Sequence, residues 1–211
     1  TINLNVIGTT NIIQAAIDFN VRRFIFASTM YVYSPYGSFY RASKQASETI
    51  IEVFSEQFDI EHSLLRYGSL YGPRAQRWNG LKGHVEQVIK NGEINYSGTG
   101  QERREYIHVK DAARLSVDIL DNQFKNKAIT ITGQQVLYSN ELIDLIFEIS
   151  GKSKKINYLG DTIGPDHYLT TPYRFTPKTS IRLVPEAFHD LGQGILELIE
   201  EISDESKTEK L

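Results

Sequence analysis

The stretch Phe24-Ile-Phe-Ala-Ser-Thr-Met-Tyr-Val-Tyr33, soon followed by Tyr40-Arg-Ala-Ser-Lys44, decides the fold expected for this chain. Its first half is an apolar run, which predicts a short buried strand over 22–27. Apolar residues that recur three or four positions apart predict a helix from about 39 to 58. A buried strand that leads into an amphipathic helix is the repeating unit of a parallel α/β sheet.

The same alternation continues on both sides of this stretch. Further strands are predicted over 61–66, 94–97, 104–109, 128–132 and 155–158. Further helices are predicted over 1–17, 80–91, 111–121, 139–150 and 190–202. This order predicts the α/β class, with a Rossmann-like doubly wound parallel sheet. The closing stretch 201–211 is charged and almost free of apolar residues, so we expect a flexible tail there.

Composition excludes several classes of function. The chain has 211 residues, a net charge of −3 and no cysteine, so disulfides and thiolate metal sites are excluded. The five histidines show no metal-ligand spacing, and we predict no metal site. There is no basic block to attract nucleic acid and no apolar run long enough for a membrane span. We therefore expect no nucleic-acid or membrane partner and a cytoplasmic location.

Tyr40 and Lys44 form a Tyr-x-x-x-Lys pair on the predicted helix. Residues four apart share one helix face, so the lysine ammonium would lie beside the phenol. A nearby cation favours the phenolate and lowers the pKa of a tyrosine, which is ordinarily too high for a base at neutral pH. A second pair, Tyr106 and Lys110, lies in a strand-like alternation before Asp111, a predicted helix N-cap. We interpret that second pair as structural.

Four stretches, taken in order, resemble one family. Phe24–Tyr33 resembles the strand that ends in a catalytic Ser or Thr in UDP-galactose 4-epimerase and its relatives. Asn5-Val-Ile-Gly-Thr, Leu65-Arg-Tyr-Gly-Ser-Leu-Tyr-Gly-Pro73 and the segment from Gly98 to Asp111 are similar to further motifs of these enzymes. The chain is thus similar to the extended short-chain dehydrogenase/reductase family of sugar-nucleotide epimerases and dehydratases. The resemblance weakens beyond about residue 150.

The resemblance implies roles for particular residues. The catalytic residues would be Thr29, Tyr40 and Lys44. The cofactor, NAD or alternatively NADP, would contact Asn5, Ser28, Tyr40, Lys44 and Tyr67. Ser69 and Arg104 would contact a nucleotide-sugar substrate, with the arginine fork on its diphosphate. The family also implies a homodimer, by analogy alone.

The resemblance further implies two lobes. Residues 1–72 and 111–132 would belong to the dinucleotide-binding domain, and residues 73–110 and 133–200 to a smaller α+β substrate-binding lobe. The family's first strand and its glycine-rich turn, which meets the pyrophosphate, would precede Thr1. The chain as given is therefore expected to bind a dinucleotide weakly or not at all.

Two departures from the family motifs bear on the reaction. Met30 and Tyr31 stand where 4,6-dehydratases carry Asp-Glu, and neither can move a carbon-bound proton as a carboxylate can. Ser69 replaces the usual asparagine. We therefore expect epimerisation, or oxidation and reduction, of a nucleotide-activated sugar. The alternatives are a non-catalytic cofactor-sensing or scaffold relative and a 4-keto-sugar reductase; the sugar and its nucleotide base stay open.

Overall fold

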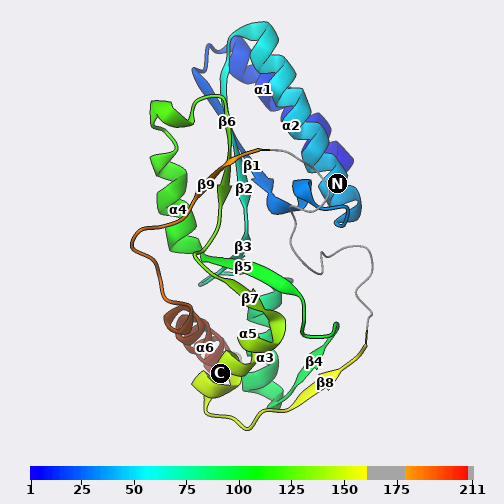
Figure 1. Ribbon diagram of the computed structural model, residues 1–211, viewed down its shortest axis with the longest axis vertical. Coiled ribbons are helices and arrows are strands. Elements are labelled where there is room, and N and C mark those ends of the chain that lie inside the picture. The colour runs from blue at the N-terminus through cyan, green and yellow to red at the C-terminus, as the bar shows by residue number, and fades with distance from the viewer. Residues whose placement is uncertain (161–178, 209–211) are drawn as a thin grey trace. The chain divides into compact units, whose positions relative to one another are not determined.

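The computed structural model describes residues 1–160 and 179–208, and these form two compact units (Figure 1). The first unit contains residues 1–68 and 114–132 together with strand β9 (Ile181–Leu183). The second contains residues 69–113, 133–160 and 185–208. The division into a dinucleotide-binding domain and a substrate-binding lobe stays a prediction. Strand β9, which was expected in the substrate lobe, pairs with the sheet of the first unit.

The first unit is built on a parallel sheet in the order β1-β2-β6-β9. The three strands before β9 are β1 (Arg23–Thr29), β2 (Glu61–Tyr67) and β6 (Lys127–Ile131). All three neighbouring pairs are parallel, and Thr29 at the end of β1 is in register with Tyr67. The parallel α/β sheet predicted from the alternation is confirmed.

Helices cover this sheet. They are η1 (Asn3–Ile7), which runs into α1 (Gly8–Asp18), η2 (Met30–Tyr33), α2 (Ser38–Phe58), α4 (Val109–Asp118) and η3 (Asn122–Phe124). Figure 1 shows α1 and α2 side by side. Ile13 and Ile51, on these two helices, are fully buried against Phe26 and Leu64 of the sheet. The apolar stripes read from the sequence therefore face the sheet, as an amphipathic helix requires.

The second unit has two small sheets and three helices. One sheet has the order β3-β5-β7, and the other pairs β4 with β8. The strands are β3 (Ser69–Tyr71), β4 (Ile94–Tyr96), β5 (Arg103–His108), β7 (Val136–Tyr138) and β8 (Ile156–Tyr158). The helices are α3 (Gly80–Asn91), α5 (Ser139–Ser150) and α6 (Leu191–Thr208). Their buried faces meet in one core through Val85, Ile143 and Ile195.

Two local predictions are wrong. The stretch expected to be a flexible tail is helical as far as Thr208, while residues 209–211 lie outside the described residues. Ile202 is fully buried there, and Lys82 donates to Glu201 at 2.9 Å, so the acidic residues have a cationic partner. Asp111 is not an N-cap, because α4 begins two residues before it. Its carboxylate instead accepts from the backbone and the ring of His189.

A buried ion pair joins α2 to the sheet. Arg66 on β2 donates to both carboxylate oxygens of Glu48 on α2, at 2.9 and 2.8 Å. The exposed side-chain fractions are 2% for Arg66 and 0% for Glu48. Ser28 on β1 donates to the same carboxylate at 2.6 Å, and Arg66 also donates to the Tyr33 hydroxyl at 2.8 Å. This bidentate geometry fixes the position of α2 on β1 and β2.

Within the described residues, no helix combines the length and the apolar character that a bilayer crossing requires.

Arg66→Met is expected to lower the free energy of unfolding by about 3–5 kcal/mol, because it leaves the Glu48 carboxylate buried without its counter-charge. The matched control is Arg22→Met, since Arg22 is 73% exposed beside Glu61 and its loss should cost less than about 1 kcal/mol. Denaturant unfolding measures both variants. Equal losses from the two would contradict the structural role given to the buried pair.

Candidate active site

The candidate active site lies where β1 ends and α2 begins. Thr29 is the last residue of β1, and its hydroxyl accepts from the backbone N–H of Tyr31 at 3.3 Å, which caps η2. The chain turns at Gly37, whose φ of 104° is in the left-handed region, and α2 starts directly after it. Tyr40 and Lys44 therefore stand one turn apart on the first turns of α2.

The structure brings Tyr40 and Thr29 together. Burial raises the pKa of the Tyr40 phenol, while a hydrogen bond with the Thr29 side chain lowers it. Burial has the larger effect, so the pKa of Tyr40 is raised, whereas the sequence predicted that the Lys44 ammonium would lower it. Tyr40 as a whole remains 44% exposed. The phenol is therefore partly shielded, paired with a second hydroxyl and open to solvent on one side. A substrate hydroxyl can be held between two such groups.

Lys44 faces the end of β1. Its Nζ donates to the Ala27 carbonyl oxygen at 2.7 Å and lies 4.6 Å from the centre of the Phe26 ring. Burial lowers the pKa of Lys44, and the Glu48 carboxylate one turn along α2 opposes that shift. An ammonium has three donors, so donors remain after the bond to Ala27.

Asn5 lies against α2 beside the Tyr40–Lys44 turn. Its side-chain amide donates to the Ser43 hydroxyl at 2.9 Å, and its backbone oxygen accepts from Ser47 at 2.7 Å. Ser43 and Ser47 are fully buried, so small side chains allow this close approach. Asn5 belongs to a π-helical turn, a widened geometry that is frequent at functional sites.

Ser28 and Tyr67 have structural partners. Ser28 is 5% exposed and donates its hydroxyl to Glu48 rather than toward Tyr40. The Tyr67 hydroxyl shares a 2.6 Å hydrogen bond with Ser116 on α4. A contact from either hydroxyl to a cofactor would require that bond to be shared or exchanged.

The two predicted substrate contacts belong to the second unit. Ser69 opens β3 and pairs in register with Tyr106. Arg104 lies on β5 and donates to the Arg103 carbonyl oxygen at 2.8 Å. Burial raises the pKa of Tyr96 strongly, and the Arg104 cation opposes that rise, which places the guanidinium near the Tyr96 phenol.

Glu102, which was not among the predicted site residues, organises the loop before Arg104. The backbone N–H groups of Thr99 and Gly100 and the Tyr96 hydroxyl donate to its carboxylate at 2.7, 3.0 and 2.7 Å. Burial alone would raise the pKa of Glu102, but these bonds outweigh it and the pKa is lowered. A glutamate two residues after Gly-x-Gly was the available signal, since backbone amides in such loops bind anions.

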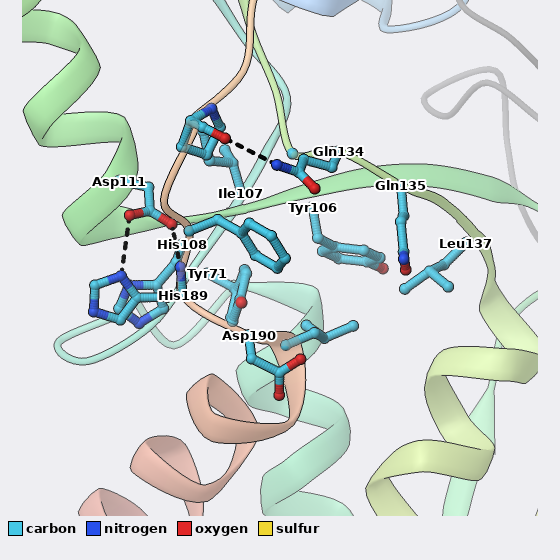
Figure 2. A pocket seen from close by; sticks show the side chains of 14 residues that line it. Tyr71, Tyr106, Ile107, His108, Asp111, Gln134, Gln135, Leu137, His189 and Asp190 are labelled. Carbon is cyan, nitrogen blue, oxygen red and sulfur yellow. Dashed lines mark hydrogen bonds and ion pairs between the residues drawn. The ribbon is translucent and has the colours of Figure 1, made fainter.

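The second unit also contains a cavity of about 140 Å³ that the sequence did not predict (Figure 2). The His108 and His189 rings stack beside it, with centres 4.4 Å apart. Asp111 accepts from the His189 ring at 3.0 Å. None of the predicted site residues lines this cavity. Across residues 1–160 and 179–208, no group of three or more His, Asp or Glu side chains could hold a metal ion.

Comparison with known proteins identifies the family. The profile described as the NAD dependent epimerase/dehydratase family matches residues 1–132, more than half of the chain. The chain belongs to this family. The matched residues include Thr29, Tyr40 and Lys44, so all three predicted catalytic residues lie in the part of the chain that matches the family profile.

Named relatives and solved structures resemble the chain at low sequence identity. A UDP-glucuronate 4-epimerase of Thermodesulfobacterium geofontis is 23% identical over 75% of this chain and 53% of its own length. The UDP-glucose 4-epimerase of Thermotoga maritima, solved with UDP-glucose, superposes with a TM-score of 0.80 at 22% identity. That match covers 97% of this chain and 71% of the epimerase.

A dTDP-glucose 4,6-dehydratase of Bacillus anthracis, solved with NAD, gives a TM-score of 0.82 at 19% identity. The match covers 98% of this chain and 69% of the dehydratase. At these identities the two solved structures show a shared fold. The chain spans about half the length of the Thermodesulfobacterium relative and about seven-tenths of the two structures.

Glu102→Gln is expected to destabilise the protein at pH 7 by about 1–3 kcal/mol, because an amide accepts these bonds less well than a carboxylate. The native pKa lies below the ordinary 4.5, so the carboxylate's contribution is present above about pH 4.5. It is lost as the pH falls through the native pKa, and the variant should lack that part of the acid dependence. Unfolding curves from pH 7 to 3 measure this, with the exposed Glu186→Gln as control. An unchanged acid profile in Glu102→Gln would refute the anchoring role.

Proposed function

We propose that this protein catalyses NAD(P)-dependent epimerisation, or oxidation and reduction, of a nucleotide-activated sugar. The observation that carries the proposal is that the Thr29 and Tyr40 side chains interact at the end of β1, with Lys44 one turn further along α2. Family membership supplies the reaction class, and this geometry supplies a base for it.

The residues present fit a nicotinamide cofactor. The Lys44 ammonium keeps donors for a ribose hydroxyl after its bond to Ala27. The half-exposed Tyr40 leaves one side of the phenol accessible, and Asn5 is held beside the same turn of α2. Bound NAD would supply a hydride acceptor and donor beside this phenol. We propose NAD as the cofactor and leave NADP as the alternative.

Each side chain then has a role in the proposal. Tyr40 takes the proton from a sugar hydroxyl and later returns it, while Lys44 stabilises the phenolate. Thr29 holds the reacting oxygen by sharing its hydrogen bond with Tyr40. Arg104 grips the substrate diphosphate with its guanidinium fork, and Ser69 contacts the substrate nearby. Ser28 and Tyr67 are assigned to the cofactor side, once their bonds to Glu48 and Ser116 are shared.

Two further features belong to this proposal. Met30 and Tyr31 follow Thr29, so no carboxylate follows it for the elimination of water, which favours epimerisation or redox chemistry.

Exposed apolar side chains on α2, Val53 at 49% and Phe58 at 53%, support a homodimer formed through this helix.

The direct test incubates the full natural gene product with NAD and either UDP-glucose or UDP-glucuronate and follows the sugar by proton NMR. Catalytic conversion to a C4 epimer without net NADH release supports an epimerase. Stoichiometric formation of NADH would instead identify the oxidoreductase alternative, and the same incubation with NADP in place of NAD tests the other cofactor. No change in any nucleotide sugar tested would favour the non-catalytic relative.

Tyr40→Phe is expected to lower kcat by roughly 10²–10⁴-fold with little change in KM, because it removes the proposed base and leaves the ring in place. Tyr158→Phe is the matched control, since this half-exposed phenol lies on β8 in the second unit, and it should keep kcat within about two-fold. Steady-state kinetics measure both. Full turnover by Tyr40→Phe would contradict the assignment of Tyr40 as the base.

Lys44→Met is expected to move the acidic limb of the kcat/KM profile to higher pH by about one unit or more. The reason is that activity rises as Tyr40 deprotonates, and loss of the neighbouring cation raises the pKa of that phenol. Lys125→Met, which removes a lysine paired with Glu61 elsewhere on the same unit, is the control and should leave the limb in place. An unmoved limb in Lys44→Met would contradict the proposed role of the ammonium.

A further inference from the structure

Tyr31 contacts the proposed base through its ring. It lies in η2, two residues after Thr29, and its ring meets the Tyr40 ring edge-on, with centres 6.2 Å apart and planes at 77°. This is a favourable aromatic geometry, because the positive edge of one ring faces the negative face of the other. The ring of Tyr31 therefore covers part of the Tyr40 side chain.

The Tyr31 ring also lies against Gly37. A Cβ atom at Gly37 would lie 2.8 Å from Cδ1 of Tyr31 and 3.0 Å from Cβ of Arg41, closer than side chains tolerate. The φ of 104° at Gly37 is also strained for any other residue. The glycine thus serves both the turn into α2 and the space for this ring.

Polar contacts hold the same loop on α2. Arg41 donates to the carbonyl oxygens of Ser34, at 3.1 Å, and Pro35. Gln45 donates to the Val32 carbonyl oxygen at 2.8 Å. Two kinds of contact therefore hold the loop after β1 on α2. Side chains of α2 donate to backbone carbonyl oxygens of the loop, and the Tyr31 ring packs against Tyr40.

Thr29 links the two tyrosines. Its hydroxyl accepts from the Tyr31 backbone N–H and is hydrogen-bonded to the Tyr40 phenol. A shift of Tyr31 would therefore move both the ring that packs on Tyr40 and the backbone that orients Thr29.

We propose that Tyr31 is a positioning residue: its ring, matched in shape to Gly37, holds the Tyr40 phenol against Thr29. The ring of Tyr31 makes this contact. Its catalytic consequence rests on the proposed function, whereas the positioning itself does not.

The test follows the Tyr40 phenol by NMR in the 211-residue chain labelled at tyrosine Cζ, with Tyr40→Phe used to assign the signal. Burial holds the pKa of Tyr40 above its ordinary value. Tyr31→Ala uncovers the phenol, so its pKa should fall toward the ordinary value, whereas Tyr31→Phe should leave it unchanged. An unchanged pKa in Tyr31→Ala would overturn the proposal, as would an equal shift in both variants.

Folding and activity give independent readings. If circular dichroism shows that Tyr31→Ala does not fold, Tyr31→Leu removes the aromatic edge but keeps apolar volume, and the same pKa fall is expected. In an active full-length enzyme, Tyr31→Ala should lower kcat roughly 10-fold with KM within about two-fold, and Tyr31→Phe should restore it. If the wild type shows no turnover, the proposed function fails while the NMR titration still decides the positioning role.

Discussion

The candidate active site depends on a buried ion pair. The Glu48 carboxylate and the Arg66 guanidinium are both almost completely buried, so each is tolerated only beside the other. Glu48 lies one turn after Lys44 on α2, and Arg66 lies on the strand next to β1. The pair therefore fixes the rotation of α2 about its axis, and that rotation directs Tyr40 and Lys44 toward the end of β1.

The remaining contacts refine this placement. Ser43 and Ser47 keep one face of α2 narrow enough for the π-helical turn that contains Asn5. The loop after Thr29 is fastened over the start of the same helix, with Gly37 leaving space for an aromatic ring. These contacts along α2 thus set the positions of the Tyr40 phenol and the Lys44 ammonium. Such support is what holds a reactive geometry within tolerance.

Sequence alone predicted the parts of this arrangement that follow a period. The strand that ends at Thr29 is an apolar run, the helix bearing Tyr40 and Lys44 is long and amphipathic, and both are where they were expected. The strands β3, β7 and β9 are three residues each and were missed, whereas β4 and β8 are as short and were predicted. Glu48 was not predicted as part of the site, because its partner Arg66 lies 18 residues away on a strand. The acidic end of α6 was taken for a tail because its partner, Lys82, is distant in sequence. Partners far apart in the chain leave no local signal.

The proposed site requires the Tyr40 phenol to face a bound nicotinamide ring, and a titration of that phenol tests this placement. The Cζ signal of Tyr40 would be followed against pH in the full natural gene product, with and without saturating NAD. A cationic ring beside the phenol lowers its pKa, so we expect the Tyr40 pKa to fall on addition of NAD. A Tyr40 pKa that stays the same at saturating NAD would place the phenol away from the cofactor and refute the proposed site.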